Sequence, residues 1–174
     1  NNWRRYLFSL QSPGENIPEE DLQNVDFAVT SVSLEENGDR TPIPYVTPPG
    51  VQRQVSQVGN GETIQQNGQA LALQVCGLKD GDSRAVFKEV SVDMRQFTGL
   101  RMFIHAESQP ERPPLRNGDI RATIRIGSDF TNNYYEYQVP LQITQPGTTR
   151  AEDIWPETNR INLILDELVK AKTE

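Results

Sequence analysis

The chain has 174 residues, of which 35% are hydrophobic and 24% charged, with 12 Pro and 12 Gly; this composition is typical of a folded, turn-rich chain and argues against disorder. The net charge is -7 and the basic residues do not cluster, which argues against nucleic acid or an anionic membrane surface as a partner. The single cysteine, Cys76, excludes an internal disulfide and a cysteine-ligated zinc site, and no apolar run approaches the roughly 18 residues of a membrane-spanning helix.

The beginning of the chain is echoed near its end. Residues 1–11 and 132–142 both start with Asn-Asn, continue through aromatic residues and finish with Leu-Gln. The segments that follow, 18–29 and 156–165, both run from Pro-Glu into an apolar stretch. A repeated strand, turn and strand predicts tandem copies of one β-unit. We therefore expect the first copy to be cut short by the start of the chain, which would make the chain a piece of a longer protein.

The domain organisation is predicted from a proline-rich segment. Residues 1–40, with a strand expected from Val25 to Leu34, are interpreted as a strand pair from the end of a preceding β-sandwich unit. Residues 41–54 contain four prolines, and proline cannot donate a hydrogen bond to a sheet, so we expect an extended connector there. Residues 55–174 then form a β-sandwich domain.

Turn signals recur through the chain. Asn and Gly tolerate the positive φ of tight hairpin turns, so Asn-Gly and Asp-Gly pairs predict strand reversals. These pairs occupy residues 37–38, 60–61, 67–68, 80–81 and 117–118. Short strands with regular breaks predict an all-β fold, an antiparallel β-sandwich of jelly-roll (galactose-binding-like) type. Further expectations are a strand from Ala85 to Val92 and a loop from Gln109 to Leu115.

The strongest strand pattern lies in residues 118–127. Alternate apolar side chains there predict one buried face: Ile120, Ala122, Ile124 and Ile126. The next strand offers a matching set: Tyr135, Tyr137, Val139 and Leu141. Aligning the two faces places Ile124 opposite Tyr137 and Arg125 opposite Glu136. A cross-strand ion pair at that position contributes about 0.2–1 kcal/mol, so it would favour the register more than the stability.

Two other elements are expected. Leu100 to Ala106 carries apolar groups on both faces, which is typical of a central strand covered on two sides. Leu165 to Lys172 is the one short C-terminal helix that we expect, with lysines near its C-terminal end.

The inventory of reactive residues is poor. His105 lies in an apolar run without a serine or cysteine partner nearby in sequence, and we interpret it as a core or sheet-surface residue. Residues 80–83 (Asp-Gly-Asp-Ser) hint at calcium, but a turn between strands explains the same residues. The acidic residues Glu152, Asp153 and Glu157 are interpreted as surface groups. We expect no enzyme, and no catalytic, cofactor-binding or metal-binding residues.

Aromatic residues near loops are the candidates for contact with a ligand or a partner. They are Phe130, Tyr134 and Trp155. Such side chains could stack on a sugar ring, but ordinary packing at the edge of a sandwich is the favoured interpretation. Tyr135 is assigned to the predicted core instead.

Several long motifs resemble those of one known family, the SprA/Sov family, which is the outer-membrane translocon of the Bacteroidetes type 9 secretion and gliding-motility system. The motifs are spread across nearly the whole chain: Asn1–Leu10, Thr41–Val46, Pro48–Val51, Leu78–Asp82, Met102–Glu107, Gly127–Tyr137 and Ile154–Glu157. Gln54 departs from the acidic residue expected after Val51-Gln52-Arg53. The resemblance supplies no catalytic residues.

The resemblance implies a place in a larger assembly. Members of that family look like very large transmembrane β-barrels with soluble inserts, which export folded cargo and work with an outer-membrane barrel partner and a plug protein. The chain then would be a non-catalytic soluble insert domain that shapes the vestibule or cap of the pore and contacts partner subunits or cargo, on the extracellular or periplasmic side of the cell outer membrane. The alternative is a carbohydrate-binding module of jelly-roll type.

Overall fold

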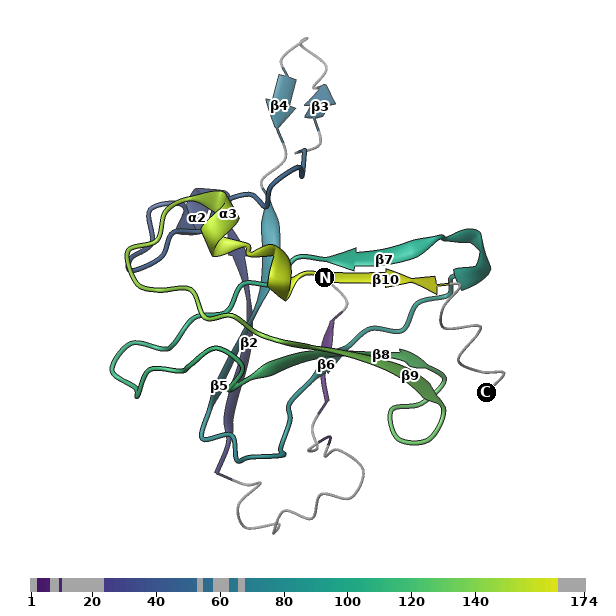
Figure 1. The fold of residues 1–174 in the computed structure, drawn as a ribbon. Helices are drawn as coiled ribbons and strands as arrows, with labels where there is room; N and C mark the ends of the chain where they lie inside the picture. Colours follow the sequence, from purple (N-terminus) through teal and green to yellow (C-terminus); the bar gives the residue numbers. More distant parts are fainter. Residues whose placement is uncertain are drawn as a thin grey trace.

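The computed structural model describes residues 3–6, 10, 24–52, 55–57, 63–65 and 68–165. In these residues the chain is mostly strand, with only short helical turns (Figure 1). The strands are β1 (Arg4–Arg5), β2 (Asp26–Ser33), β3 (Val55–Gln57), β4 (Thr63–Gln65), β5 (Gln69–Cys76), β6 (Val86–Phe87), β7 (Gly99–Met102), β8 (Arg121–Gly127), β9 (Tyr134–Pro140) and β10 (Ile161–Ile164). The helices are α2 (Leu34–Asn37) and α3 (Ala151–Ile154), with 3₁₀ turns at Met94–Gln96 and Glu157–Asn159.

The strands form two-stranded antiparallel sheets whose pairings are nested. The β3–β4 pair lies inside the β2–β5 pair, which in turn lies inside the β1–β6 pair. In the second half of the chain, β8–β9 lies inside β7–β10. Each half therefore folds back on itself once, and β3–β4 projects from the rest of the described chain (Figure 1). The prediction of a strand-dominated chain is confirmed, and the jelly-roll type stays a prediction.

Sheet pairing crosses the proline-rich segment. Both described strands of residues 1–40 find their partners beyond that segment, because β1 pairs with β6 and β2 with β5. The proline-rich segment also contributes to the interior, since Ile43 is 1% and Tyr45 8% exposed. It is therefore more than the plain connector that the prolines suggest, although the division of the chain into domains stays a prediction.

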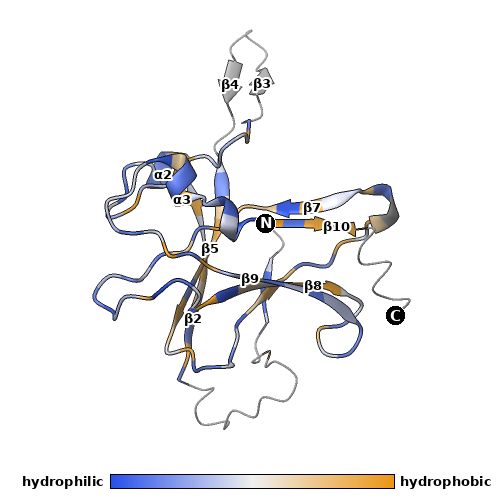
Figure 2. Ribbon diagram, in the orientation of Figure 1, coloured by the Kyte–Doolittle hydropathy of each residue, from blue (hydrophilic) through white to orange (hydrophobic). Residues whose placement is uncertain are grey.

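Two groups of buried residues hold the fold together. The first core contains Ala106, Val139, Leu141, Ile143, Ile161, Leu163 and Leu165. The second core contains Ile43, Tyr45, Ile154 and Trp155. In β10 burial alternates, so Ile161 and Leu163 enter the first core while Asn162 and Ile164 face outward. Figure 2 shows this apolar character along β8 and β10.

The predicted register of β8 and β9 is confirmed. Ile124 lies opposite Tyr137 and Arg125 opposite Glu136. Arg125 Nε donates a hydrogen bond of 2.6 Å to Glu136 Oε2, which is the expected cross-strand ion pair. Period-two alternation was sufficient here because a slip of one residue would turn the apolar face of each strand toward water.

The strand predicted over residues 100–106 is present only in part, as β7, and its predicted central position is wrong. β7 ends at Met102 and pairs with β10 alone among the described strands. The residues that follow leave the sheet and pack against both cores, since Phe103 contacts the second core and Ala106 belongs to the first. The apolar residues on the two faces of this segment therefore belong to two separate cores. The segment connects these cores.

Turn signals were correct in some places and wrong in one. Gly81 and Gly118 have φ of 81° and 87°, the left-handed conformation that these turns require. Gly38, in contrast, has φ of -62° and ends α2. The reason is a helix start that competes with the turn: Ser33 caps α2 by accepting a hydrogen bond from the Glu36 backbone N–H at 3.3 Å.

The remaining expected elements have mixed outcomes. The strand expected from Val25 to Leu34 is present as β2, whereas the one expected from Ala85 to Val92 is reduced to β6. Residues 109–115 form the predicted loop. The helix expected from Leu165 to Lys172 lies outside the described residues beyond position 165.

Candidate functional site

The end of the β8–β9 hairpin brings two of the three predicted contact residues together. Arg125 lies between them, because its guanidinium carbon is 4.3 Å from the centre of the Tyr134 ring and its Nη1 donates a hydrogen bond of 2.7 Å to the Phe130 carbonyl oxygen. The Phe130 ring in turn packs on the rings of Tyr6 and Phe87, with centroids 5.3 Å and 5.2 Å away. The hairpin end is thereby attached to the β1–β6 sheet.

Asp129 shapes the loop that carries Phe130. Its carboxylate accepts hydrogen bonds from the backbone N–H groups of Thr131, Asn132 and Asn133 and from the Asn133 side chain. The Asn132 backbone N–H, followed by the other three donors, holds the pKa of Asp129 well below its usual range. Asp129 therefore remains charged and keeps the loop closed over the whole ordinary pH range.

Trp155, the third predicted contact residue, lies elsewhere and is buried. It is 8% exposed, and its indole N–H donates a hydrogen bond of 2.9 Å to the Val46 carbonyl oxygen. Its ring meets those of Tyr45 and His105 edge to face, with centroids 6.1 Å and 5.9 Å away. The three aromatic side chains thus form no common flat platform for a sugar, and their role as contact residues stays a prediction.

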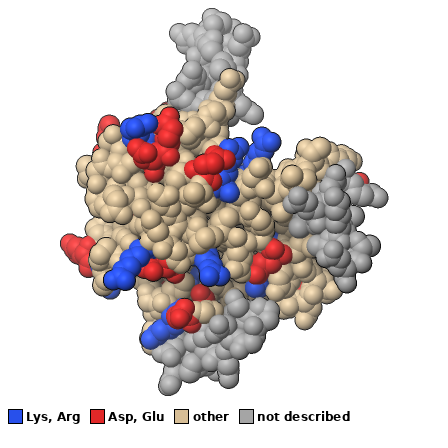
Figure 3. Space-filling view, in the orientation of Figure 1, with Lys and Arg blue, Asp and Glu red and all other residues tan. Residues whose placement is uncertain are grey.

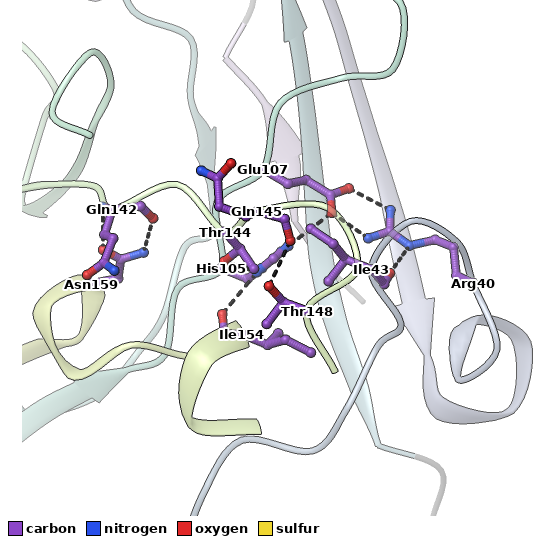
Figure 4. Close-up of polar contacts among 10 residues, drawn as sticks. All are labelled: Arg40, Ile43, His105, Glu107, Gln142, Thr144, Gln145, Thr148, Ile154 and Asn159. Atoms are coloured by element: carbon purple, nitrogen blue, oxygen red, sulfur yellow. Dashed lines mark hydrogen bonds and ion pairs between the residues drawn. The ribbon is translucent and has the colours of Figure 1, made fainter. Parts of the chain in front are cut away.

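A polar network that the sequence did not suggest lies beside Trp155. Arg40 binds Glu107 through two hydrogen bonds, 2.7 Å from Nη1 to Oε1 and 2.8 Å from Nη2 to Oε2. His105 continues the network, with Nε2 3.1 Å from Glu107 Oε2 and Nδ1 3.0 Å from the Ile154 carbonyl oxygen (Figure 4). It joins the residue before the proline-rich segment, the residues after β7 and the end of α3.

The network keeps Glu107 ionised. Burial by itself would raise the pKa of Glu107, but the hydrogen bonds from His105 and Arg40, with the positive charge of these groups, hold that pKa below its ordinary value of 4.5. A carboxylate whose pKa is lowered in the folded state stabilises the fold above its unfolded pKa, and this stabilisation is lost as the pH falls through the folded pKa.

We therefore expect Glu107→Gln to matter less in acid. The free energy of unfolding, measured with urea, should be lower for Glu107→Gln than for the unaltered chain at about pH 6, and the difference should shrink toward about pH 3. Glu157→Gln is the control, because the Glu157 side chain is 79% exposed and its ion pair with Arg160 contributes about 0–1 kcal/mol. A difference that is the same at both pH values would contradict the assignment.

The other candidate residues are engaged in ordinary structural contacts. Asp82, from the segment with a hint of calcium, has a fully buried side chain paired with Arg84 at 2.6 Å. In the part of the chain that the structure describes, no group of three His, Cys, Asp or Glu residues is placed to hold a metal ion. The predicted surface acids are indeed exposed: Glu152, Asp153 and Glu157.

The surface has mixed charge. In Figure 3 basic and acidic side chains lie next to one another in small groups on the face shown. Among the described residues, no helix combines the length and the apolar character needed to cross a membrane.

Comparison with known proteins identifies the family. No curated protein matches the chain. The profile of one protein family, SprA_N, described as "Motility related/secretion protein", matches residues 1–174, which is the full length of the sequence. The match covers the hairpin end, the polar network and both cores alike. The chain therefore belongs to the SprA_N family of motility-related and secretion proteins.

Proposed function

We propose that the chain is a non-catalytic insert domain of a protein-export translocon in the outer membrane, the translocon of the type 9 secretion and gliding-motility system. The observation that carries this proposal is the family match to motility and secretion proteins over residues 1–174. In the proposal the domain is a β-sandwich of jelly-roll type that shapes the vestibule or cap of the export pore. The nested strand pairing of both halves supports such a sandwich.

The engagement of the polar residues supports a scaffold. Arg40 and His105 both bind Glu107, and Asp82 binds Arg84. Each of these side chains forms hydrogen bonds with a buried or half-buried neighbour. Structural polar residues typically have such partners. A domain of this kind acts by its shape and its surface, so its partners are other parts of the translocon, the outer-membrane barrel partner, the plug protein and exported cargo.

The end of the β8–β9 hairpin is the proposed contact surface. Asp129 fixes the loop conformation, and Arg125 holds Phe130 and Tyr134 in place. Aromatic residues and arginine are enriched where protein partners bind, because each offers a large contact area on a stiff side chain. A fixed hairpin end with these residues therefore suits a protein partner.

The test uses the full-length protein in cells. Asn159→Ala should unfold or weaken this domain, for the reasons given below, whereas Thr158→Ala changes an exposed neighbour whose hydroxyl only reaches the Gln142 side chain. We expect the first variant to reduce the amount of cargo released into the medium and the spreading of colonies, and the second to leave both unchanged. The amount of full-length protein is measured by immunoblot in each strain. Normal export with a demonstrably unfolded domain would overturn the proposal.

The contact surface has a separate test. A photo-crosslinking amino acid is placed at Tyr134 and, as the matched control, at Thr123, which is exposed on β8 of the same hairpin. We expect crosslinks to another translocon subunit or to cargo from position 134 and not from position 123. Crosslinks from neither position would reject the hairpin end while leaving the insert-domain proposal standing, and turnover in a hydrolase screen of the purified chain would reject the non-catalytic role.

A further inference from the structure

His105 is the only histidine of the chain, and both of its ring nitrogens face oxygen atoms. Nδ1 lies 3.0 Å from the Ile154 carbonyl oxygen and Nε2 lies 3.1 Å from Glu107 Oε2 (Figure 4). A carbonyl oxygen can only accept a hydrogen bond, and the Glu107 carboxylate, ionised beside Arg40, also only accepts. The two contacts are hydrogen bonds at the same time only if both ring nitrogens donate, which requires the doubly protonated imidazolium.

A neutral ring has to give up one of these two bonds. With its proton on Nδ1, the ring would aim the Nε2 lone pair at the Glu107 carboxylate, which is repulsive. With its proton on Nε2, the ring keeps the bond to Glu107, and Nδ1 can accept from the Thr144 hydroxyl, 3.3 Å away. The second arrangement costs less free energy. The hydrogen bond that it loses is the one to the Ile154 carbonyl oxygen.

We propose that His105 is a pH-dependent latch on α3. Protonation of Nδ1 by a proton from solvent forms the hydrogen bond to the Ile154 carbonyl oxygen at the end of α3. Loss of that proton to solvent breaks this bond and turns Nδ1 toward the Thr144 hydroxyl. The side chain is 18% exposed, so solvent protons can reach it. The latch is closed when the ring is doubly protonated and open when the ring is neutral.

The groups that face the ring are either held in one charge state or exposed. On its own segment Glu107 stays ionised, because its pKa is lowered, and it is neutralised by Arg40. In the proline-rich segment burial raises the pKa of Tyr45, so the phenol stays neutral. The charged groups at α3 are exposed and lie near one another: Arg150, Glu152 and Asp153. Histidine is the side chain whose ordinary titration falls between about pH 5 and 8.

Nuclear magnetic resonance of the whole chain tests the latch directly. A single histidine gives a single set of ring signals, and a long-range proton–nitrogen correlation distinguishes a nitrogen with a proton from one with a lone pair. In mild acid we expect both nitrogens to carry protons. As the pH rises, Nε2 should keep its proton and Nδ1 should lose it. The amide signals of α3 should shift with the same midpoint, and their hydrogen exchange should accelerate on the order of tenfold.

Two variants sharpen the test. Thr144→Val keeps the shape of a buried side chain and removes the hydroxyl that the neutral ring uses, so the latch should open at higher pH than in the unaltered chain. His105→Gln should remove the pH-dependent change in the α3 signals. The proposal is overturned if the neutral ring keeps its proton on Nδ1, or if the α3 signals do not follow the ring. Both of these outcomes are read on the unaltered chain, so they do not depend on the folding of a variant.

Discussion

Replacing Asn159 by alanine is expected to lower the free energy of unfolding by about 2–4 kcal/mol. Asn159 is 0% exposed, and its side chain takes the place of a neighbouring strand. Oδ1 accepts a hydrogen bond of 2.7 Å from the Gln142 backbone N–H, and Nδ2 donates one of 2.9 Å to the Gln142 carbonyl oxygen. Alanine leaves both backbone groups without a partner, next to the buried residues Leu141 and Ile143.

Urea unfolding of the purified chain measures this loss. Thr158→Ala is the matched control, because Thr158 is the preceding residue, is exposed and bonds only the Gln142 side chain at 3.0 Å. Its effect should stay within about 0.5 kcal/mol, as for most surface substitutions. If Asn159→Ala cost no more than this control, water would be able to replace the side chain amide, and the strand-like role of Asn159 would be refuted.

Replacing Trp155 by alanine is expected to cost about 3–5 kcal/mol, the range for large aromatic residues in a core. The side chain is the largest member of the second core, where it lies with Ile43, Tyr45 and Ile154. Its indole N–H also satisfies the Val46 carbonyl oxygen. Removal therefore leaves a cavity and an unpaired backbone acceptor in the contact between the proline-rich segment and α3.

A graded series separates these two contributions. Trp155→Phe keeps an aromatic ring and loses the N–H donor, so we expect a smaller cost, about 1–3 kcal/mol. Val90→Ala, at a position that is 60% exposed, is the control for removal of an apolar side chain and should cost less than about 0.5 kcal/mol. Equal costs for Trp155→Phe and Trp155→Ala would mean that the ring itself contributes little, against its 8% exposure.

Local patterns predicted some elements of the fold and misled at others. The alternation in residues 118–127 located β8 and its register with β9, because strand periodicity and a nearby hairpin partner are both written in adjacent residues. The apolar pattern of residues 100–106 predicted a strand covered on two sides. Two cores meet there instead, and the sequence does not indicate which core each apolar residue joins. Residues 33–36 read Ser-Leu-Glu-Glu, the pattern of a capping box, whereas the Asn-Gly pair that follows predicted a strand reversal at this place.

Only part of the candidate site could be predicted from local patterns in the sequence. Phe130 and Tyr134 are candidates because they are aromatic residues near loops, and the hairpin brings both to Arg125. Trp155 was selected by the same reasoning and proved to be buried. Aromatic residues at loops serve surfaces and cores alike, so their type alone does not separate the two uses.

The amino-acid sequence by itself determined the strand-rich character, the β8–β9 register and, through its long motifs, membership of the SprA_N family. Only the tertiary structure decided that Ile43 and Tyr45 of the proline-rich segment are buried and that Arg40 binds Glu107, which lies 67 residues away along the chain. The physical reason is the range of the interactions. Periodicity and turns depend on neighbouring residues, whereas a polar network between distant segments exists only where the whole fold brings its members together.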